Sequence, residues 1–169
     1  MIRHMKWANE TIFTQVSELS ESALSFSAWN PEWTVGHICN HIVIAQGRFL
    51  SRLQKIDPPA ENPFPLTQSG MKQLVAKSLE NDTKFAKYLD DPDEMLTFVR
   101  YGETVSFLKS TLLAQVIHHA TDHRSQIAAI LAVNDMDVIN LDAIDFWEFE
   151  KYERKNKKRK TKRDLRATL

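Results

Sequence analysis

Two histidines four residues apart, His119 and His123, have the spacing that lets two imidazole rings on one face of a helix bind a single metal ion. They stand where apolar side chains belong, because the helical pattern continues on both sides of them. That pattern consists of Leu112, Val116, Ile127 and Ile130. The spacing therefore predicts metal binding by neutral histidine side chains.

The alternative is that each ring is a buried neutral histidine, hydrogen-bonded within the protein. Two rings in register on one apolar stripe would each need a separate partner in a close-packed interior, so metal binding is the favoured interpretation. It still requires a third ligand. The adjacent His118 is rotated by about 100° from His119, toward Asp122 and Ser125, and we expect it at the surface.

A second pair, His37 and His41, also has a spacing of four residues and lies in another helical segment. On a helical wheel His41 borders the apolar arc, whereas His37 points further toward water, so His41 is the better third ligand. Cys39 falls well inside the apolar arc on the opposite side from His41. It is expected to be a small buried side chain and not half of a Cys-His catalytic pair.

Several enzyme classes are excluded because their motifs are missing. The zinc-protease helix has a glutamate directly after its first histidine, and Ala120 stands there instead. Di-iron bundles need Glu-x-x-His pairs, which the sequence lacks. The four glycines are too scattered for a dinucleotide-binding loop, a phosphate-binding loop or a nucleophile elbow.

The composition is that of one globular domain, with 169 residues, 43% hydrophobic and 26% charged. A chain of this length buries enough surface to fold without disulfides or a structural metal, so a metal would serve chemistry. The only cysteine cannot form an intrachain disulfide. Neither a signal peptide nor a membrane span is evident, and we expect a cytoplasmic protein without membrane partners.

Helical periodicity marks four long segments. They cover residues 2–24, about 34–55, about 69–89 and about 110–133. Four of the six prolines fall in residues 57–66, which must form an extended loop. Residues 96–107 are rich in β-branched and aromatic side chains and predict a short hairpin before the fourth segment. A fifth, short aromatic helix is expected over roughly 141–152.

These elements predict an all-α fold, a four-helix bundle with a short extended connection. The bundle is assigned to residues 1–150 and a basic C-terminal tail to 151–169. The tail holds 10 Lys/Arg and 2 Asp/Glu, against 12 and 20 in the rest of the chain. Such a tail can bind nucleic acid, but no aromatic side chain follows Tyr152 to stack on bases, so a solvated extension is favoured.

Two stretches resemble signatures of the DinB-like (DNA-damage-inducible) superfamily. Residues 33–41 read WTVGHICNH, similar to the start of that family's second helix. Residues 118–127 read HHATDHRSQI, similar to its helix-four motif N-H-x-x-x-H-R-G-Q, with His118 and Ser125 as departures. Trp7-Ala8-Asn9 resembles its common opening. The resemblance covers residues 1 to about 150 and implies an up-down-down-up bundle.

By this resemblance His41, His119 and His123 match the family's metal-binding triad, in agreement with the helical-wheel argument. Three histidines leave coordination positions open, as in catalytic sites. Zinc, nickel, iron and manganese all accept imidazole ligands. Arg124 and Gln126 are candidates for contacts behind the metal ligands or with an anion.

The resemblance implies a metal-dependent enzyme that transfers a low-molecular-weight thiol to a small electrophile through a metal-bound thiolate. One alternative is a hydrolase that uses metal-bound water. Another is a non-catalytic stress-response or interaction protein whose basic tail engages nucleic acid. Phe146 and Trp147 are expected to be exposed and favour a homodimer.

Overall fold

The computed structural model describes the backbone of residues 1–167 and the side chains of residues 1–159. The chain is mostly helical, with one two-stranded hairpin. The long helices are α1 (Ile2–Ser17), α3 (Val35–Gln54), α4 (Gln68–Phe85), α5 (Lys109–Val133) and α6 (Phe146–Ala167). The shorter elements are α2 (Glu21–Leu24), η1 (Ala86–Tyr88), η2 (Asp142–Ile144), β1 (Met95–Arg100) and β2 (Glu103–Leu108).

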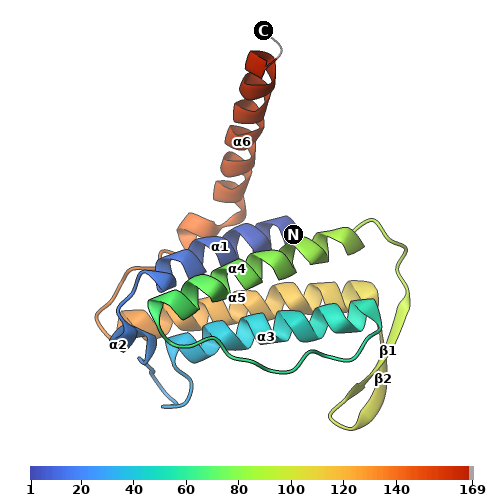
Figure 1. Cartoon of the computed structure of the whole chain (residues 1–169), viewed down its shortest axis with the longest axis horizontal. Coiled ribbons are helices and arrows are strands. Elements are labelled where there is room, and N and C mark those ends of the chain that lie inside the picture. The colour runs from blue at the N-terminus through green and yellow to red at the C-terminus, as the bar shows by residue number, and fades with distance from the viewer. Residues whose placement is uncertain (168–169) are drawn as a thin grey trace.

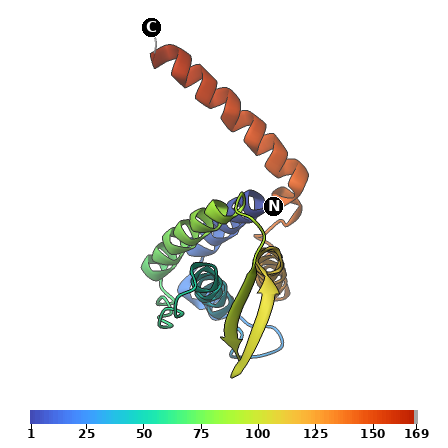
Figure 2. The ribbon, with the colours of Figure 1, turned by 90° about the vertical axis from the view of Figure 1, so that its right-hand side faces the viewer.

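Four of the long helices lie side by side and enclose the core (Figure 1, Figure 2). Helices α1 and α3 each pack against both α4 and α5. In Figure 1, α1 and α5 run from the hairpin end of the molecule toward α2, whereas α3 and α4 run the opposite way. The core is filled by the apolar stripes of these helices. In α1, for example, Met5, Ala8, Ile12 and Val16 are fully buried.

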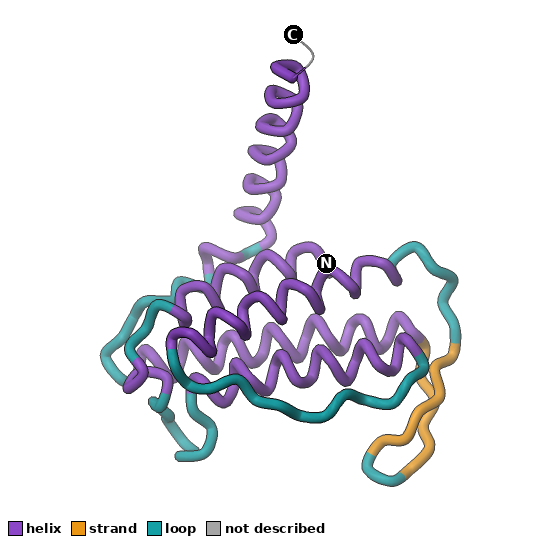
Figure 3. The backbone as a smooth tube through the Cα atoms, viewed as in Figure 1, coloured by secondary structure: helices purple, strands orange, loops and turns teal. Residues whose placement is uncertain are grey.

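Helices α3 and α4 can run in the same direction because a long connection returns along the bundle (Figure 3). It spans residues 55–67 and contains the proline-rich stretch. The buried side chain of Asn40 holds it against α3, since Asn40 Nδ2 donates to the Phe64 carbonyl at 3.1 Å and the Phe64 N–H donates to Asn40 Oδ1 at 2.6 Å. The extended loop expected from the prolines is confirmed.

The predicted hairpin is also present. Strands β1 and β2 pair antiparallel, from Met95 opposite Leu108 to Arg100 opposite Glu103. Tyr101 and Gly102 form the turn with φ values of 52° and 83°, both in the left-handed region that a two-residue hairpin turn requires. Buried Leu96 attaches the hairpin to the helices at the ends of α3 and α5.

The first and third helices are shorter than the sequence predicts. A single helix over 2–24 is wrong, because α1 ends at Ser17 and Ser20 caps the separate helix α2 by accepting the Ala23 N–H at 3.3 Å. Helix α4 ends at Phe85 and narrows into η1. Leu89, at the end of the range predicted to be helical, lies beyond α4 and is 46% exposed.

The last helix is longer than predicted. The short helix expected over 141–152 is replaced by η2 and by α6, which continues through the basic segment and projects from the bundle (Figure 1, Figure 2). The boundary assigned at residue 150 thus lies inside α6. Ion pairs such as Glu150–Arg154, spaced four residues apart, favour helix here. Within the part of the chain that the structure describes, no helix is long and apolar enough to cross a membrane.

Candidate metal centre

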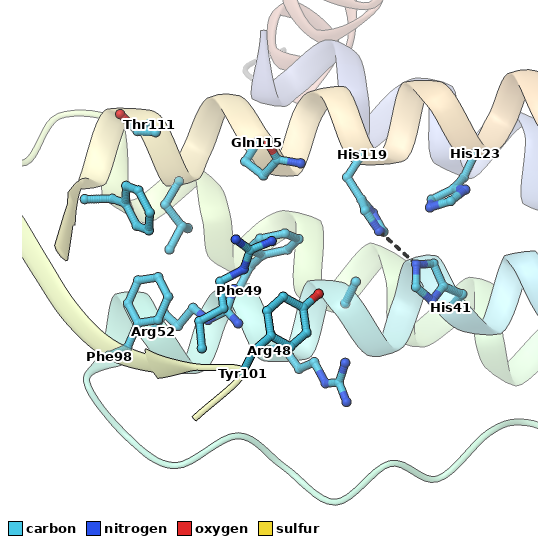
Figure 4. A pocket seen from close by; sticks show the side chains of 14 residues that line it. His41, Arg48, Phe49, Arg52, Phe98, Tyr101, Thr111, Gln115, His119 and His123 are labelled. Carbon is cyan, nitrogen blue, oxygen red and sulfur yellow. Dashed lines mark hydrogen bonds between the residues drawn. The ribbon is translucent and has the colours of Figure 1, made fainter. Parts of the chain in front are cut away.

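Three histidines from two helices meet between α3 and α5. His41 lies in α3, and His119 and His123 lie one turn apart in α5 (Figure 4). All three are partly buried, and each offers one ring nitrogen within 4.8 Å of the others. The Nε2 atoms of His41 and His119 are 3.0 Å apart and share a hydrogen bond. The rings whose convergence the sequence predicts are therefore brought together.

The start of α3 sets the position of His41. Thr34 caps this helix by accepting the His37 N–H at 3.2 Å. The indole of Trp33, just before the cap, fills the space between the helices. Its ring centre lies 5.1 Å from that of His41 and 5.6 Å from that of His123.

Gln126 connects this indole to the triad. Its Oε1 accepts a hydrogen bond from Trp33 Nε1 at 3.1 Å and another from His123 Nδ1 at 2.7 Å. Because an amide oxygen can only accept, the proton of neutral His123 is placed on Nδ1 and the lone pair on Nε2. Gln126 thus holds His123 in the tautomer that a metal ligand needs at Nε2.

The protonation states of His41 and His119 also suit a metal. Burial, reinforced by the nearby His123, lowers the pKa of both His41 and His119 to about 4. Both rings are therefore neutral near pH 7, the form in which histidine binds a metal. Three imidazoles on one wall of a cavity are a donor set that fits a divalent transition metal.

The other candidates from the sequence lie elsewhere. His37 and His118 are exposed. Cys39 is fully buried on the far side of α3, where burial raises the pKa of its thiol. This agrees with its expected role as a small core side chain.

Arg124 is buried away from the triad, in a polar network that the sequence reasoning missed. Its guanidinium donates to Thr121 Oγ1 at 2.9 Å and to Asn9 Oδ1. Asp82 accepts from Asn9 at 2.9 Å and from Gln46 at 2.8 Å. The sequence contains a pattern that could have predicted this network, because Gln46 and Asp82 interrupt apolar stripes as the histidines do.

The triad opens into a cavity of about 560 Å³ between α3, α5 and the hairpin (Figure 4). Its wall is aromatic and basic. Phe49, Phe98, Phe107 and Tyr101 contribute rings, and Arg48, Arg52 and Arg100 contribute guanidinium groups. These arginines were not identified from the sequence, because only the packing of the hairpin brings Arg100 to α3.

The comparisons with known proteins place this architecture in one family. The family model described as the DinB family matches residues 1–157. A crystal structure of a DinB-like protein from Bacillus cereus superposes with a TM-score of 0.57 and 22% sequence identity, over 79% of this chain and 89% of that one. That likeness concerns the fold. No curated protein is significantly similar in sequence. The chain belongs to the DinB family.

Proposed function

We propose that this protein is a metal-dependent enzyme, built on the up-down-down-up bundle of its family, that transfers a low-molecular-weight thiol to a small electrophile. One observation carries the proposal. Three histidine rings converge at a cavity large enough for a small organic molecule.

His41, His119 and His123 would hold the metal. A divalent ion bound there would lower the pKa of a thiol and so supply a nucleophile at neutral pH. Gln126 fixes the ring of His123, and Trp33 covers the triad from the start of α3. The aromatic wall of the cavity offers an apolar surface to the partner that the thiol would attack.

The donor groups of the cavity favour a thiol over water as the nucleophile. Among the described side chains that line it, none is a carboxylate that could take a proton from water. A thiol reaction does not need such a base, because a thiol loses its proton far more easily than water. The chain's own cysteine is buried outside the cavity, so the thiol would come from a small molecule.

Metal content is the first test. Elemental analysis of the purified protein should find about one divalent ion per chain. His41→Ala, His119→Ala and His123→Ala should each lose it, and the exposed controls His37→Ala and His118→Ala should retain it. A wild type without metal, or controls that lose it equally, would remove the basis of the proposal.

Thiol dependence is the second test. Metal-loaded protein should consume 1-chloro-2,4-dinitrobenzene or an epoxide only when a small thiol is added, and His119→Ala should not. Turnover of esters or amides without thiol would instead establish the hydrolase. Intact metal binding without either activity, across a panel of thiols, would favour a non-catalytic role.

A further inference from the structure

Three arginines occupy the part of the cavity next to the hairpin. Arg48 and Arg52 are four residues apart in α3 and therefore lie on the same helical face, and Arg100 ends strand β1. Figure 4 shows Arg48 and Arg52 between the triad and Phe98 of the hairpin. The cavity thus has a histidine end and an arginine end.

Two of these guanidinium groups have no acidic partner among the side chains that the structure describes. Arg48 forms an ion pair with Glu61 of the long connection. Within residues 1–159, neither Arg52 nor Arg100 pairs with a carboxylate. Arg52 instead lies 4.5 Å from the ring centre of Phe98, and Arg100 lies 4.8 Å from that of Tyr101.

The three arginines repel one another, and their positive charge contrasts with the excess of acidic side chains in the rest of residues 1–150. Residues 1–150 carry 20 acidic and 12 basic side chains, yet none of the acidic ones lines this cavity. Burial, followed by repulsion from Arg100 and Arg48, lowers the pKa of Arg52. Arginine nevertheless remains charged at neutral pH. An anion entering the cavity would offset this repulsion.

The aromatic rings around the arginines indicate that the anion has an apolar part next to its charged groups. Phe49 and Phe98 bracket Arg52, since the guanidinium lies 5.5 Å and 4.5 Å from their ring centres. They keep its planar fork in place, and such a fork binds a carboxylate through two parallel hydrogen bonds. The same rings offer an apolar surface to the part of a ligand next to its carboxylates.

We propose that Arg52 and Arg100, supported by Arg48, form a subsite for an organic dicarboxylate with an apolar body. Two guanidinium groups without a carboxylate partner among residues 1–159 match two carboxylates. The ligand would bind with its carboxylates at the hairpin and its opposite end toward the histidines. The reaction at that opposite end rests on the proposed function, but binding at the arginine end does not.

Phthalate, an aromatic ring with two adjacent carboxylates, is a suitable probe, and uncharged phthalamide is its matched control. Calorimetry on the full-length, metal-loaded protein should detect phthalate and not phthalamide. Arg52→Gln and Arg100→Gln should each raise the Kd about tenfold, the loss expected for a charged hydrogen bond. Arg154→Gln, an exposed arginine on α6, should leave it unchanged. Added salt should weaken binding.

Arg100→Gln keeps the test valid if Arg52→Gln disturbs packing, because Arg100 is exposed on the hairpin and outside the core. Equal binding of phthalate by wild type and Arg100→Gln, or equal binding of phthalamide, would overturn the subsite. His119→Ala should still bind phthalate. Arginine-dependent binding without metal or thiol activity would therefore refute the proposed function alone, whereas thiol transfer without arginine-dependent binding would refute the subsite alone.

Kinetics identify which reactant carries the carboxylates. If phthalate competes with the thiol, the thiol is the reactant that carries the two carboxylates. If phthalate competes with the electrophile, the electrophile carries them. Either result supports the subsite. An active enzyme that phthalate does not inhibit would contradict its place in the reaction.

Discussion

Polar side chains interrupt the apolar stripes of this bundle at two places, with opposite outcomes. On α5, His119 and His123 border a cavity, and one ring nitrogen of each lies within 4.8 Å of a ring nitrogen of His41 on α3. On α4, Asp82 is fully buried, and its oxygens accept hydrogen bonds from Asn9 and Gln46. The first group is available to a ligand, whereas the second is satisfied within the protein.

Gln126 should tune the metal site without binding the metal. Gln126→Leu removes the acceptor that orients His123, so metal affinity should fall by about tenfold to a hundredfold. Gln126→Glu retains an acceptor and should keep most of the affinity. Competition with a metal chelator measures the change, and Gln73→Leu at an exposed position of α4 is the control. Unchanged affinity in Gln126→Leu would refute this role.

Asp82 should make stability fall as pH rises through the acid range. Burial raises its pKa in the folded protein to about 6, from 3.8. Between these values the folded chain retains a proton that the unfolded chain releases, so raising the pH disfavours folding. The difference corresponds to about 3 kcal/mol at most.

Chemical denaturation of the metal-free protein at pH 4 and pH 7 measures this contribution. Relative to Asp82→Asn, the wild type should lose stability over that interval. The comparison is needed because His41 and His119, whose pKa is lowered to about 4, produce the opposite trend in both proteins. Parallel pH profiles for the two proteins would contradict the expectation.

At the scale of elements, the long connection after α3 packs tightly against the first turn of α4. A Cβ atom on Gly70 would lie 2.1 Å from the Pro65 carbonyl oxygen, which belongs to the backbone and cannot move aside alone. The glycine is required here by space, and its φ is ordinary for a helix.

Gly70→Ala should therefore destabilise the protein by about 1–3 kcal/mol, the cost of overpacking. Gly47→Ala is the matched control in the middle of α3, where the nearest atom to a new Cβ is Pro59 Cγ at 3.3 Å. There, improved helix propensity of up to about 1 kcal/mol should offset the contact. Urea midpoints of both variants test the contrast, and equal losses would disprove it.

At the scale of the whole molecule, the described side chains of α6 pack on the bundle in the first part of this helix. Phe149 and Tyr152 each lie with ring centres 5.5 Å from Trp7, and Phe146 stacks at 4.0 Å on His4. Trp147 is 76% exposed and Phe146 53% exposed. Their exposure agrees with the sequence expectation, and the homodimer inferred from it stays a prediction.

Truncation separates the two parts of α6. A chain ending at Arg154 retains the aromatic contacts and should keep the melting temperature of the full chain. A chain ending at Ile144 uncovers Trp7 and His4 and should melt roughly 5 °C lower or more, because the lost apolar burial amounts to a few kcal/mol. Thermal melting, monitored by circular dichroism, measures the melting temperatures of the two truncated chains. A lower melting temperature for the longer chain would show that the projecting part also stabilises the bundle.

The sequence by itself determined most of the helices and the histidine triad. Helical periodicity and spacings of four residues depend only on local geometry, so they placed His119 and His123 on one face and preferred His41 to His37. Helix ends were less predictable. Ser20 interrupted the first helix, and charge pairs extended the last one, through local hydrogen bonds and ion pairs that periodicity does not detect.

Only the tertiary structure decided what surrounds the triad. Arg124 follows His123 directly, yet the packing of α5 against α1 places its guanidinium in the core beside Asn9. Arg100 lies far from Arg52 in the sequence, and the packing of the hairpin places them in one cavity. Contacts between distant segments depend on how the elements pack, so the histidine cluster was predictable from spacing and the aromatic and basic wall of the cavity was not.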